Sequence, residues 1–433
     1  MIDIKKYAAI TNTNLWTYTG EVTRVIGMGI ESIGPMAHIG DICTVESRGN
    51  KETITAEVVG FRDGHLMLMP LGELQGIGPG CKVKAFGDKL SIKVDESLLG
   101  KVVDWRAKPI DGEEIFCKYS VPIENSAPNP LLRNRIATPL ELGVRAIDGM
   151  LTVGKGQRIG IFAGSGVGKS TLMGMIARNA LSDINIIALI GERGREVREF
   201  IENDLKLEGL KRSIVVVATS DQPALMRLKA AKTATALAEH FREQGKDVLL
   251  MMDSLTRFSM AQREIGLAIG EPPVSRGYTP SVYAELPKLL ERAGNSDKGS
   301  ITGMYTVLVD GDDFNEPITD TARGILDGHI VLSRKLAHKG HYPAIDVLAS
   351  ISRVMSNIAS PTHKKLAVEI KKQMAIYKES EDLINVGAYN KGSSSEIDLA
   401  IEKMPAINAF LCQAVGDHVA FEETLNRMQE IVG

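Results

Sequence analysis

A glycine-rich run with a lysine and two hydroxyl residues extends from Ala163 to Thr171, in the order Ala-Gly-Ser-Gly-Val-Gly-Lys-Ser-Thr. An apolar segment, Arg158 to Phe162, precedes it, and residues Lys169 to Leu181 have helical apolar spacing. A loop of this kind between a strand and a helix binds phosphate, because backbone N–H groups and the positive helix end face the anion. We therefore expect a phosphate-binding loop (P-loop) here.

The side chains of this loop have distinct expected tasks. Lys169 reaches the β- and γ-phosphates of a nucleotide, and the Ser170 hydroxyl ligates Mg²⁺. The chain has Ala163 where the general pattern has glycine, but the glycines nearest the phosphates are present. The predicted nucleotide-binding residues of the loop are Gly164, Ser165, Gly166, Val167, Gly168, Lys169, Ser170 and Thr171.

Two carboxylates are candidates for the rest of a nucleotide site. Asp253 ends an apolar segment that starts at Asp247, and an aspartate at the end of such a strand orients Mg²⁺ and its water ligands. Glu192 follows the apolar segment from Ile184 to Gly191, where it is placed to polarise a water against the γ-phosphate. Taken alone, the charged turn around Glu192 is typical of a solvated surface.

The composition limits the classes of protein to consider. The chain has 433 residues, of which 44% are hydrophobic and 24% charged, as in an ordinary globular protein of about two to four domains. A net charge of −3 gives no basic domain, so we expect no nucleic-acid partner. The four distant cysteines favour neither a zinc site nor a disulfide framework, which fits a reducing cytoplasm. No segment reaches about eighteen apolar residues, so any membrane association is expected to be peripheral.

The pattern of apolar residues divides the chain into three predicted domains. Residues 1–95 contain short β-rich segments broken by glycine, which predicts a small closed barrel or sandwich. Residues 96–355 begin with a Pro- and Asn-rich connector and continue with apolar segments alternating with helices, which predicts a buried parallel sheet. Residues 356–433 are helical and charge-rich. The predicted fold class is α/β, with a β-rich N-terminal domain, a central P-loop domain and a C-terminal helical domain.

The individual elements are predicted as follows. The β-rich region has strands at Tyr18 to Ile26, Asp41 to Val45, Glu52 to Phe61, His65 to Met69, Lys82 to Phe86 and Ser91 to Val94. The central region has strands at Arg158 to Phe162, Ile184 to Ile190, Ser213 to Ala218, Asp247 to Met252, Ile301 to Val309 and His329 to Leu332, and a long helix from Pro223 to Gly245. The C-terminal helices cover His363 to Glu381, Glu396 to Met404 and Asn408 to Val432.

Six further motifs carry a resemblance over nearly the whole chain. They are Gly-Glu-Arg-Gly-Arg-Glu (191–196), Asp-Ser-Leu-Thr-Arg-Phe (253–258), Ala-Gln-Arg-Glu-Ile (261–265), Gly-Glu-Pro-Pro (270–273), Leu-Leu-Glu-Arg-Ala-Gly (289–294) and Tyr-Pro-Ala-Ile-Asp (342–346). With them the chain closely resembles the hexameric rotary-type ATPases, and among these most closely the flagellar type III protein-export ATPases. The resemblance implies an N-terminal β-barrel, a RecA-like α/β core and a C-terminal helical domain. It also implies a Mg²⁺-dependent ATP hydrolase and a ring of six copies.

The resemblance also implies roles for single residues. Glu192 matches the catalytic glutamate that activates water, and Arg193 beside it supports the phosphate site. Asp253 matches the magnesium-orienting aspartate, and Tyr342 matches an aromatic residue that packs against adenine. Arg353 matches an arginine finger, which stabilises the transferring phosphoryl group from a neighbouring protomer. The predicted catalytic set is therefore Lys169, Glu192, Arg193 and Arg353.

Cofactors, partners and location follow from the same resemblance. ATP and Mg²⁺ are expected in a homo-hexameric ring at the cytoplasmic face of an export apparatus. Residues 1–15 lie where the family meets its negative export regulator, and the acidic loop 310–317 is expected to face the central channel and a stalk protein. The C-terminal domain is expected to meet export partners. Membrane export gate components, export substrates and chaperones are also expected partners of the protein.

Four other functions compete with flagellar export. The virulence-associated injectisome ATPase shares nearly every motif. A catalytic subunit of a proton-driven ATP synthase is disfavoured, because residues 311–317 and 327–334 look like the export branch. A ring subunit that only binds nucleotide is disfavoured by Glu192, which such family members lack. A Rho-like nucleic-acid motor is disfavoured by the charge balance.

Overall fold

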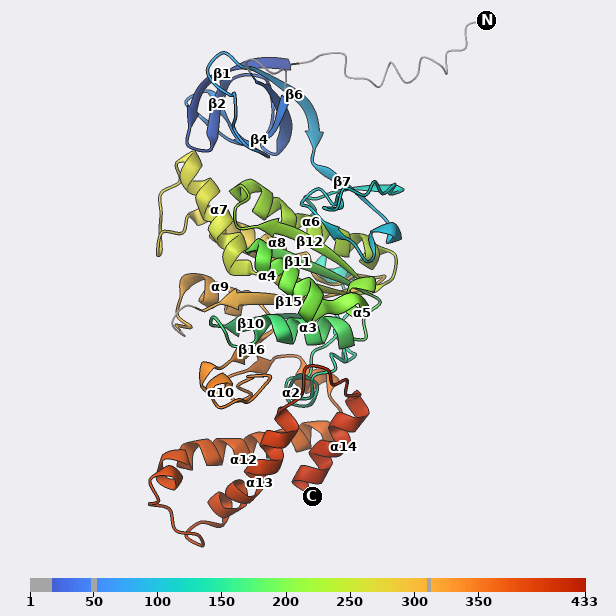
Figure 1. The fold of residues 1–433 in the computed structure, drawn as a ribbon, viewed down its shortest axis with the longest axis vertical. Helices are drawn as coiled ribbons and strands as arrows, with labels where there is room; N and C mark the ends of the chain where they lie inside the picture. The colour runs from blue at the N-terminus through green and yellow to red at the C-terminus, as the bar shows by residue number, and fades with distance from the viewer. Residues whose placement is uncertain (1–17, 48–52, 310–312) are drawn as a thin grey trace, which may run out of the picture. The chain divides into compact units, whose positions relative to one another are not determined.

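The computed structural model describes residues 18–47, 53–309 and 313–433 (Figure 1). The chain forms two compact units, of which the first contains the residues up to 91 with 223–226 and 261–281, and the second contains the remainder. Within the described ranges, none of the helices has both the length and the apolar character that a membrane span requires. Residues 1–15, the predicted contact of a regulator, and residues 310–312 of the acidic loop lie outside the described residues.

The first unit is built on a closed barrel with the strand order β1-β2-β5-β4-β3-β6. Alternate residues of β3, such as Cys43 and Val45, are buried, as expected when one face of each strand points into the barrel. Strand β2 was not predicted from the sequence; it follows β1 after a turn at Gly27, which has a positive φ of 57°. The strands are β1 (Tyr18–Ile26), β2 (Gly29–Ile33), β3 (Asp41–Glu46), β4 (Thr53–Arg62), β5 (His65–Pro70) and β6 (Lys82–Lys89).

The second unit contains a mainly parallel sheet in the order β17-β16-β10-β15-β13-β11-β12-β8. Its six central strands are the six predicted ones, and they are buried on both faces. The edge strands β8 and β17 have two residues each, too few for any periodic signal. The strands are β8 (Val102–Val103), β10 (Arg158–Ala163), β11 (Ile184–Glu192), β12 (Ser213–Thr219), β13 (Asp247–Asp253), β15 (Ser300–Leu308), β16 (Gly328–Leu332) and β17 (Ile351–Ser352), with β14 (Gly294–Asn295) pairing β15.

Helices connect the parallel strands, because a parallel pair needs a crossover between its members (Figure 1). The connecting helices are α3 (Lys169–Asn179), α4 (Gly194–Glu199), the π-helix η4 (Phe200–Leu205), α5 (Lys206–Lys211), α6 (Ala224–Glu243), α7 (Leu255–Ile269), α8 (Pro280–Glu291) and α9 (Pro317–Ile325). Helix α2 (Arg145–Met150) precedes β10, and α10 (Arg334–His338) lies between β16 and the antiparallel β17. The connector before them contains the paired strands β7 (Ser91–Val94) and β9 (Tyr119–Pro122) and the 3-10 turns η2 (Glu96–Leu98) and η3 (Pro130–Leu132).

The C-terminal region of the second unit is helical and packs on α2. A Cβ at Gly149 would lie 2.9 Å from Met428 Sδ and 3.0 Å from the Phe410 ring, so this face of α2 requires glycine. His363 Nε2 lies 2.7 Å from the Gly149 carbonyl oxygen on the same helix. The helices are α11 (Met355–Ile358), α12 (Pro361–Asn385), α13 (Ser395–Leu411) and α14 (Phe421–Val432).

One predicted helix is wrong. The sequence pattern predicted a continuous helix over residues 408–432, but α13 ends at Leu411 and α14 starts at Phe421. Between them Gln413 donates from its backbone N–H to the Tyr342 carbonyl and from Nε2 to the Gly143 carbonyl, which holds this segment against the P-loop domain. The predicted order of barrel, α/β core and helical domain is confirmed. The boundaries after residues 95 and 355 stay a prediction.

Candidate active site

The glycine-rich loop connects the end of β10 to the start of α3. Gly166 and Gly168 have positive φ angles of 76° and 86°, which residues with a side chain rarely adopt. Among the described residues, no side chain caps the first turn of α3. The first N–H groups of a helix lack partners within the helix, so this end is suited to bind an anion.

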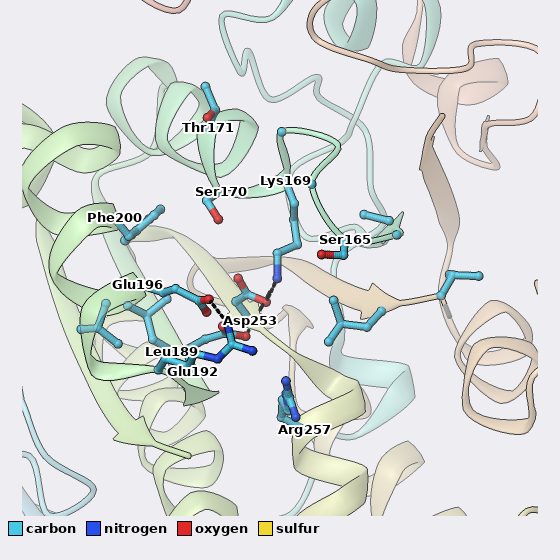
Figure 2. A pocket seen from close by; sticks show the side chains of 18 residues that line it. Ser165, Lys169, Ser170, Thr171, Leu189, Glu192, Glu196, Phe200, Asp253 and Arg257 are labelled. Carbon is cyan, nitrogen blue, oxygen red and sulfur yellow. Dashed lines mark hydrogen bonds and ion pairs between the residues drawn. The ribbon is translucent and has the colours of Figure 1, made fainter. Parts of the chain in front are cut away.

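The loop forms one wall of a cavity of about 460 Å³ (Figure 2), a size typical of ligand pockets. Of the predicted loop residues, Val167 does not line the cavity, because its side chain is 2% exposed and packs in the core. The lining residues are Ala163, Gly164, Ser165, Gly166, Gly168, Lys169, Ser170, Thr171, Leu189, Glu192, Arg193, Glu196, Val197, Phe200, Asp253, Arg257, Leu308 and Val309.

Three charged side chains meet at the centre of this cavity (Figure 2). The Lys169 ammonium lies 2.6 Å from Asp253 Oδ1 and 4.0 Å from Glu192 Oε1. They come from the P-loop and from the carboxyl ends of β13 and β11, which are neighbours in the sheet. Since parallel strands end at the same edge, residues about 84 positions apart in the sequence become adjacent here.

The backbone of β11 directs Glu192 toward this centre. Gly191 has a positive φ of 69°, and the register with β12 shifts between Ile190 and Glu192. A Cβ at Gly191 would lie 3.0 Å from Arg257 Cβ, so the turn leaves room only for glycine. The bulge thus moves the Glu192 carboxylate off the regular strand direction and into the cavity.

The environment of Glu192 raises the pKa of its carboxyl to about 7. Burial is the largest cause, the negative charge of Asp253 adds to it, and a hydrogen bond to Glu196 acts in the same direction. The positive charge of Lys169 opposes these effects. A carboxyl with a pKa near neutrality can both accept and release a proton at physiological pH, which is the property of a general base.

The donors around Asp253 fit a hard divalent cation. The Asp253 carboxylate and the Ser170 hydroxyl line the same cavity, and oxygen donors are the ligands that Mg²⁺ prefers. The negative charge of Asp253 contributes, after burial, to the raised pKa of Glu192, and a bound cation would offset that contribution. Within the described ranges no group of three His, Cys, Asp or Glu side chains could hold a metal alone. Mg²⁺ bound with a nucleotide needs only one or two protein ligands besides phosphate and water.

Tyr342 lies beside the P-loop but does not line the cavity. A Cβ at Gly168 would lie 3.5 Å from the Tyr342 ring, so the ring borders the loop at the start of α3. The residue is 45% exposed, which leaves much of the ring open to a ligand. Its carbonyl accepts the 2.9 Å hydrogen bond from Gln413, which joins its position to the C-terminal region.

Arg353 lies near the amino-terminal end of β16, whereas the P-loop lies near the carboxyl-terminal end of the same strand. It follows β17, whose Ser352 pairs with Gly328 at the start of β16, whereas the P-loop follows β10 beside the end of β16 at Leu332. Four residue steps along a strand correspond to about 13 Å. The exposed guanidinium donates to the Arg323 carbonyl at 3.2 Å. The structure thus brings Lys169 together with Glu192, Arg193 and Asp253 and separates Arg353 from them.

Three side chains at this site were not among the predicted residues. Thr306 donates a 2.7 Å hydrogen bond to Asp253 Oδ1, and Glu196 bonds both to Glu192 and to Arg193 Nη1, the latter at 3.0 Å. Arg257 lines the cavity, and its Nε has no hydrogen-bond partner among the described residues. The signal for Arg257 was its place in the motif Asp-Ser-Leu-Thr-Arg-Phe that starts at Asp253. Nothing in the sequence marked Thr306, because its contact depends on the pairing of β13 with β15.

The P-loop between β10 and α3, with carboxylates at the ends of two neighbouring strands, defines a P-loop nucleotide-binding protein. Family models agree with this class and with the domain order. Residues 143–352 match the nucleotide-binding domain of the ATP synthase alpha/beta family, and residues 22–87 match its beta-barrel domain. Residues 359–430 match the T3SS EscN ATPase C-terminal domain.

Two curated relatives are similar over their whole length. The "Flagellum-specific ATP synthase" of Bacillus subtilis is 58% identical over 98% of this chain and 97% of its own. The "Type 3 secretion system ATPase" of Xanthomonas euvesicatoria is 50% identical over 95% of this chain and 93% of its own. The assembled ATPase EscN of enteropathogenic E. coli has 46% identity and a TM-score of 0.90, covering 96% of this chain and 100% of that one. The chain therefore belongs to the family of flagellar and type III secretion ATPases, which confirms the resemblance drawn from its motifs.

Proposed function

We propose that this protein is a Mg²⁺-dependent ATPase that energises type III protein export in flagellum assembly, through the unfolding or delivery of export substrates and their chaperones. The observation that carries the proposal is the contact of Lys169 with Asp253 and Glu192 in a cavity bordered by a P-loop. A loop alone supports only binding of a nucleotide. A partly buried glutamate of near-neutral pKa beside it supports hydrolysis.

Each residue of the cavity has a task in this proposal. Lys169 and the first N–H groups of α3 bind the β- and γ-phosphates. Asp253 and Ser170 hold Mg²⁺, which supplies charge neutralisation at the phosphates when it is bound. Glu192 accepts the proton of the attacking water, and Arg193 supports the phosphate site. The unpaired Nε of Arg257 supports a further contact of this cavity wall with the nucleotide.

The two remaining predicted residues act at the border of the site. The ring of Tyr342, next to Gly168, packs against the adenine base. Arg353 acts as an arginine finger in the site of a neighbouring protomer, because its position past the opposite end of β16 keeps it from its own Lys169. A closed ring is the simplest assembly in which every copy both gives and receives such a residue. We propose six copies.

Partners and location belong to the same proposal. One solved relative is described as the assembled ATPase EscN "in complex with its central stalk EscO", with a TM-score of 0.87 to this chain. By analogy we propose that a stalk protein meets the acidic loop that ends at Pro317. We further propose a position at the cytoplasmic face of the export apparatus, with a regulator, gate components, substrates and chaperones as partners and only peripheral contact with the membrane.

The injectisome ATPase is the main alternative, because secretion ATPases are also among the similar relatives. The flagellar relative from Bacillus subtilis is 58% identical, against 50% for the secretion ATPase of Xanthomonas euvesicatoria, which favours the flagellar role. Deletion of the gene in its own host tests the choice. We expect loss of flagellar filaments and motility, restored by the intact gene; normal filaments with lost secretion of virulence proteins would instead establish the injectisome role.

We call a nucleotide site that is completed by Arg353 of a neighbouring protomer the shared site. The ATPase rate per subunit, measured as a function of protein concentration, tests it. We expect this rate to rise with concentration, because assembly supplies Arg353 to each site. Arg353→Ala is expected to reduce turnover at least about 100-fold at every concentration while the protomer still binds nucleotide. Arg198→Ala, which removes another exposed arginine, is the matched control and should retain activity. A rate of the Arg353→Ala variant equal to that of the wild type would refute the finger.

A further inference from the structure

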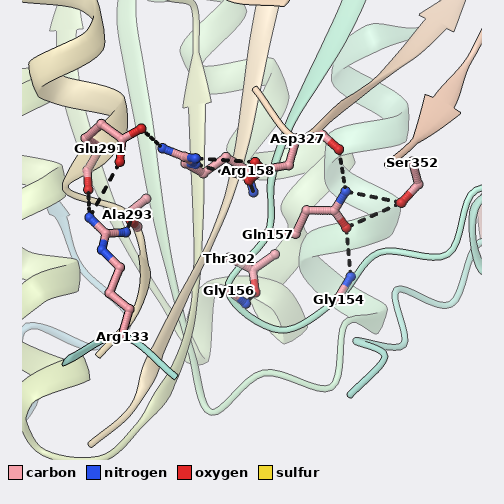
Figure 3. Close-up of polar contacts among 10 residues, drawn as sticks. All are labelled: Arg133, Gly154, Gly156, Gln157, Arg158, Glu291, Ala293, Thr302, Asp327 and Ser352. Carbon is pink, nitrogen blue, oxygen red and sulfur yellow. Dashed lines mark hydrogen bonds and ion pairs between the residues drawn. The ribbon is translucent and has the colours of Figure 1, made fainter. Parts of the chain in front are cut away.

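Gln157 is a completely buried amide that lies outside the nucleotide cavity, one residue before β10. Its Nε2 donates to the Asp327 carbonyl and to Ser352 Oγ, both at 3.1 Å (Figure 3). Its Oε1 accepts from the Gly154 N–H at 2.9 Å. Both donors and the acceptor of the amide are therefore used, so its orientation is fixed.

Both groups that Gln157 binds, the Ser352 hydroxyl and the Asp327 carbonyl, adjoin the backbone of Arg353. Ser352 precedes Arg353, and its hydroxyl donates in turn to the Thr152 carbonyl at 2.8 Å. The backbone N–H of Arg353 donates to the Asp327 carbonyl at 3.0 Å, the same oxygen that Gln157 binds. Gln157 thus joins both backbone anchors of Arg353.

Asp327 is itself held rigidly. Its carboxylate accepts from the Arg158 backbone N–H at 3.0 Å and from Arg158 Nε at 3.1 Å (Figure 3). The Arg158 side chain is only 14% exposed and also pairs with Glu291. Next to Asp327, a Cβ at Gly328 would lie 2.4 Å from the Ile351 carbonyl oxygen, so β16 and β17 approach as closely as they do only with glycine there.

The short strand β17, which ends one residue before Arg353, needs such anchors. β17 has only two residues, and it pairs with β16 through Gly328 and His329 alone. The Arg353 side chain is exposed and meets the Arg323 carbonyl at 3.2 Å. The direction of the guanidinium therefore depends on how firmly the backbone at Ser352 and Arg353 is held.

We propose that Gln157 is a positioning residue for Arg353: through Ser352 and Asp327 it holds the finger in the direction in which it enters the site of the neighbouring protomer. This inference rests on the proposed function of Arg353. It adds that a side chain outside the protomer's own nucleotide cavity controls hydrolysis in the site of the neighbouring protomer. A change at Gln157 should lower turnover while the variant's own cavity binds nucleotide normally, because Gln157 touches none of the cavity's polar groups.

The test uses mixed assemblies of the full-length protein. Gln157→Leu removes the amide at similar volume, and Glu192→Gln inactivates a protomer's own site but leaves its finger. Alone, Gln157→Leu is expected to lose about tenfold or more in kcat, with nucleotide affinity within about twofold of the wild type. Mixed in equal amounts with Glu192→Gln, it should regain turnover well above the sum of the two separate rates, since each intact Gln157→Leu site then receives a proper finger.

Three further variants make the outcome decisive. Arg353→Ala mixed with Glu192→Gln tests the shared site independently of Gln157: turnover should return, because the Glu192→Gln protomers supply the missing Arg353. Asn185→Leu removes another fully buried amide, on β11, that has no link to Arg353; any activity it loses should not return on mixing. Ser352→Ala removes only the hydroxyl between Gln157 and the finger, and it should show the same rescue as Gln157→Leu, which covers the case of a Gln157→Leu chain that does not fold.

The possible results separate the two proposals. Rescue of Arg353→Ala but not of Gln157→Leu or Ser352→Ala would overturn the positioning role and leave the shared site intact. Rescue of none of the three would refute the shared site, and the positioning role would fall with it. Wild-type turnover of both Gln157→Leu and Ser352→Ala would overturn the positioning role, and so would equal rescue of Asn185→Leu.

Discussion

Lys169 Nζ lies 2.6 Å from Asp253 Oδ1, which joins the P-loop to the end of β13 through a nearly buried ion pair. The same ammonium lies 4.0 Å from Glu192 on β11. One cation is thus shared by two carboxylates from neighbouring strands. Burial and the negative charge of Asp253 raise the pKa of the Glu192 carboxyl, and Lys169 offsets this rise only in part.

Replacement of Glu192 by glutamine separates hydrolysis from binding. The Glu192→Gln side chain keeps the shape of the protonated carboxyl but cannot accept a proton, so we expect turnover to fall about 10²- to 10⁴-fold. Binding of a fluorescent ATP analogue should change little, because Lys169 and the loop are intact. Glu202→Gln, on the exposed side of η4, is the control. Phosphate release at the wild-type rate from Glu192→Gln would remove Glu192 from the mechanism.

The raised pKa of Glu192 predicts the pH dependence of the rate. Glu192 must be deprotonated to act as a base. We therefore expect kcat to rise with pH through a midpoint of about 7 and to level off above it. Glu196 raises the pKa of Glu192, so Glu196→Gln should move this midpoint to lower pH. Glu202→Gln should leave it in place. A profile that is flat from pH 6 to 8 would contradict the assignment, as those limits are about one pH unit on either side of the expected midpoint.

The position of the Tyr342 ring predicts a change in KM. We expect Tyr342→Ala to raise the KM for ATP about three- to tenfold, because a stacking contact contributes about 0.5–1.5 kcal/mol. Tyr342→Phe keeps the ring and should stay within about twofold of the wild type. Tyr377→Ala, on α12, is the matched control for loss of a tyrosine. An unchanged KM in Tyr342→Ala would show that the base does not use this ring.

Gly149 predicts how firmly the C-terminal helices hold the core. Gly149→Val inserts atoms where a Cβ alone would lie 2.9 Å from Met428 Sδ and 3.1 Å from Thr424. Overpacking of this kind costs about 1–3 kcal/mol, so a lower denaturation midpoint in urea is expected. Gly324→Ala, at a helical glycine with open space around it, should be neutral or stabilising. Equal stability of Gly149→Val and the wild type would show that α14 does not pack as described.

The sequence was sufficient for the elements with a strong local signal. The six central strands of the sheet are continuous apolar runs, and the P-loop combines glycines that favour positive φ with a helix start. The strand pattern, from which β2 was missing, left a closed barrel or a sandwich open, and only the family resemblance favoured the barrel that the structure shows. The helix predicted over 408–432 failed because long-range bonds of Gln413 hold the segment after Leu411 out of helical form.

The sequence by itself therefore determined the fold class, the nucleotide-binding loop and the candidate carboxylates, since each depends on neighbouring residues. Only the tertiary structure decided which of them meet. The parallel pairing of β11, β13 and β15 brings Glu192, Asp253 and Thr306 together near the carboxyl ends of these strands. Because β17 runs antiparallel to β16, Arg353 lies near the amino-terminal end of β16. Strand order and direction are set by packing of the whole sheet, which no local pattern encodes.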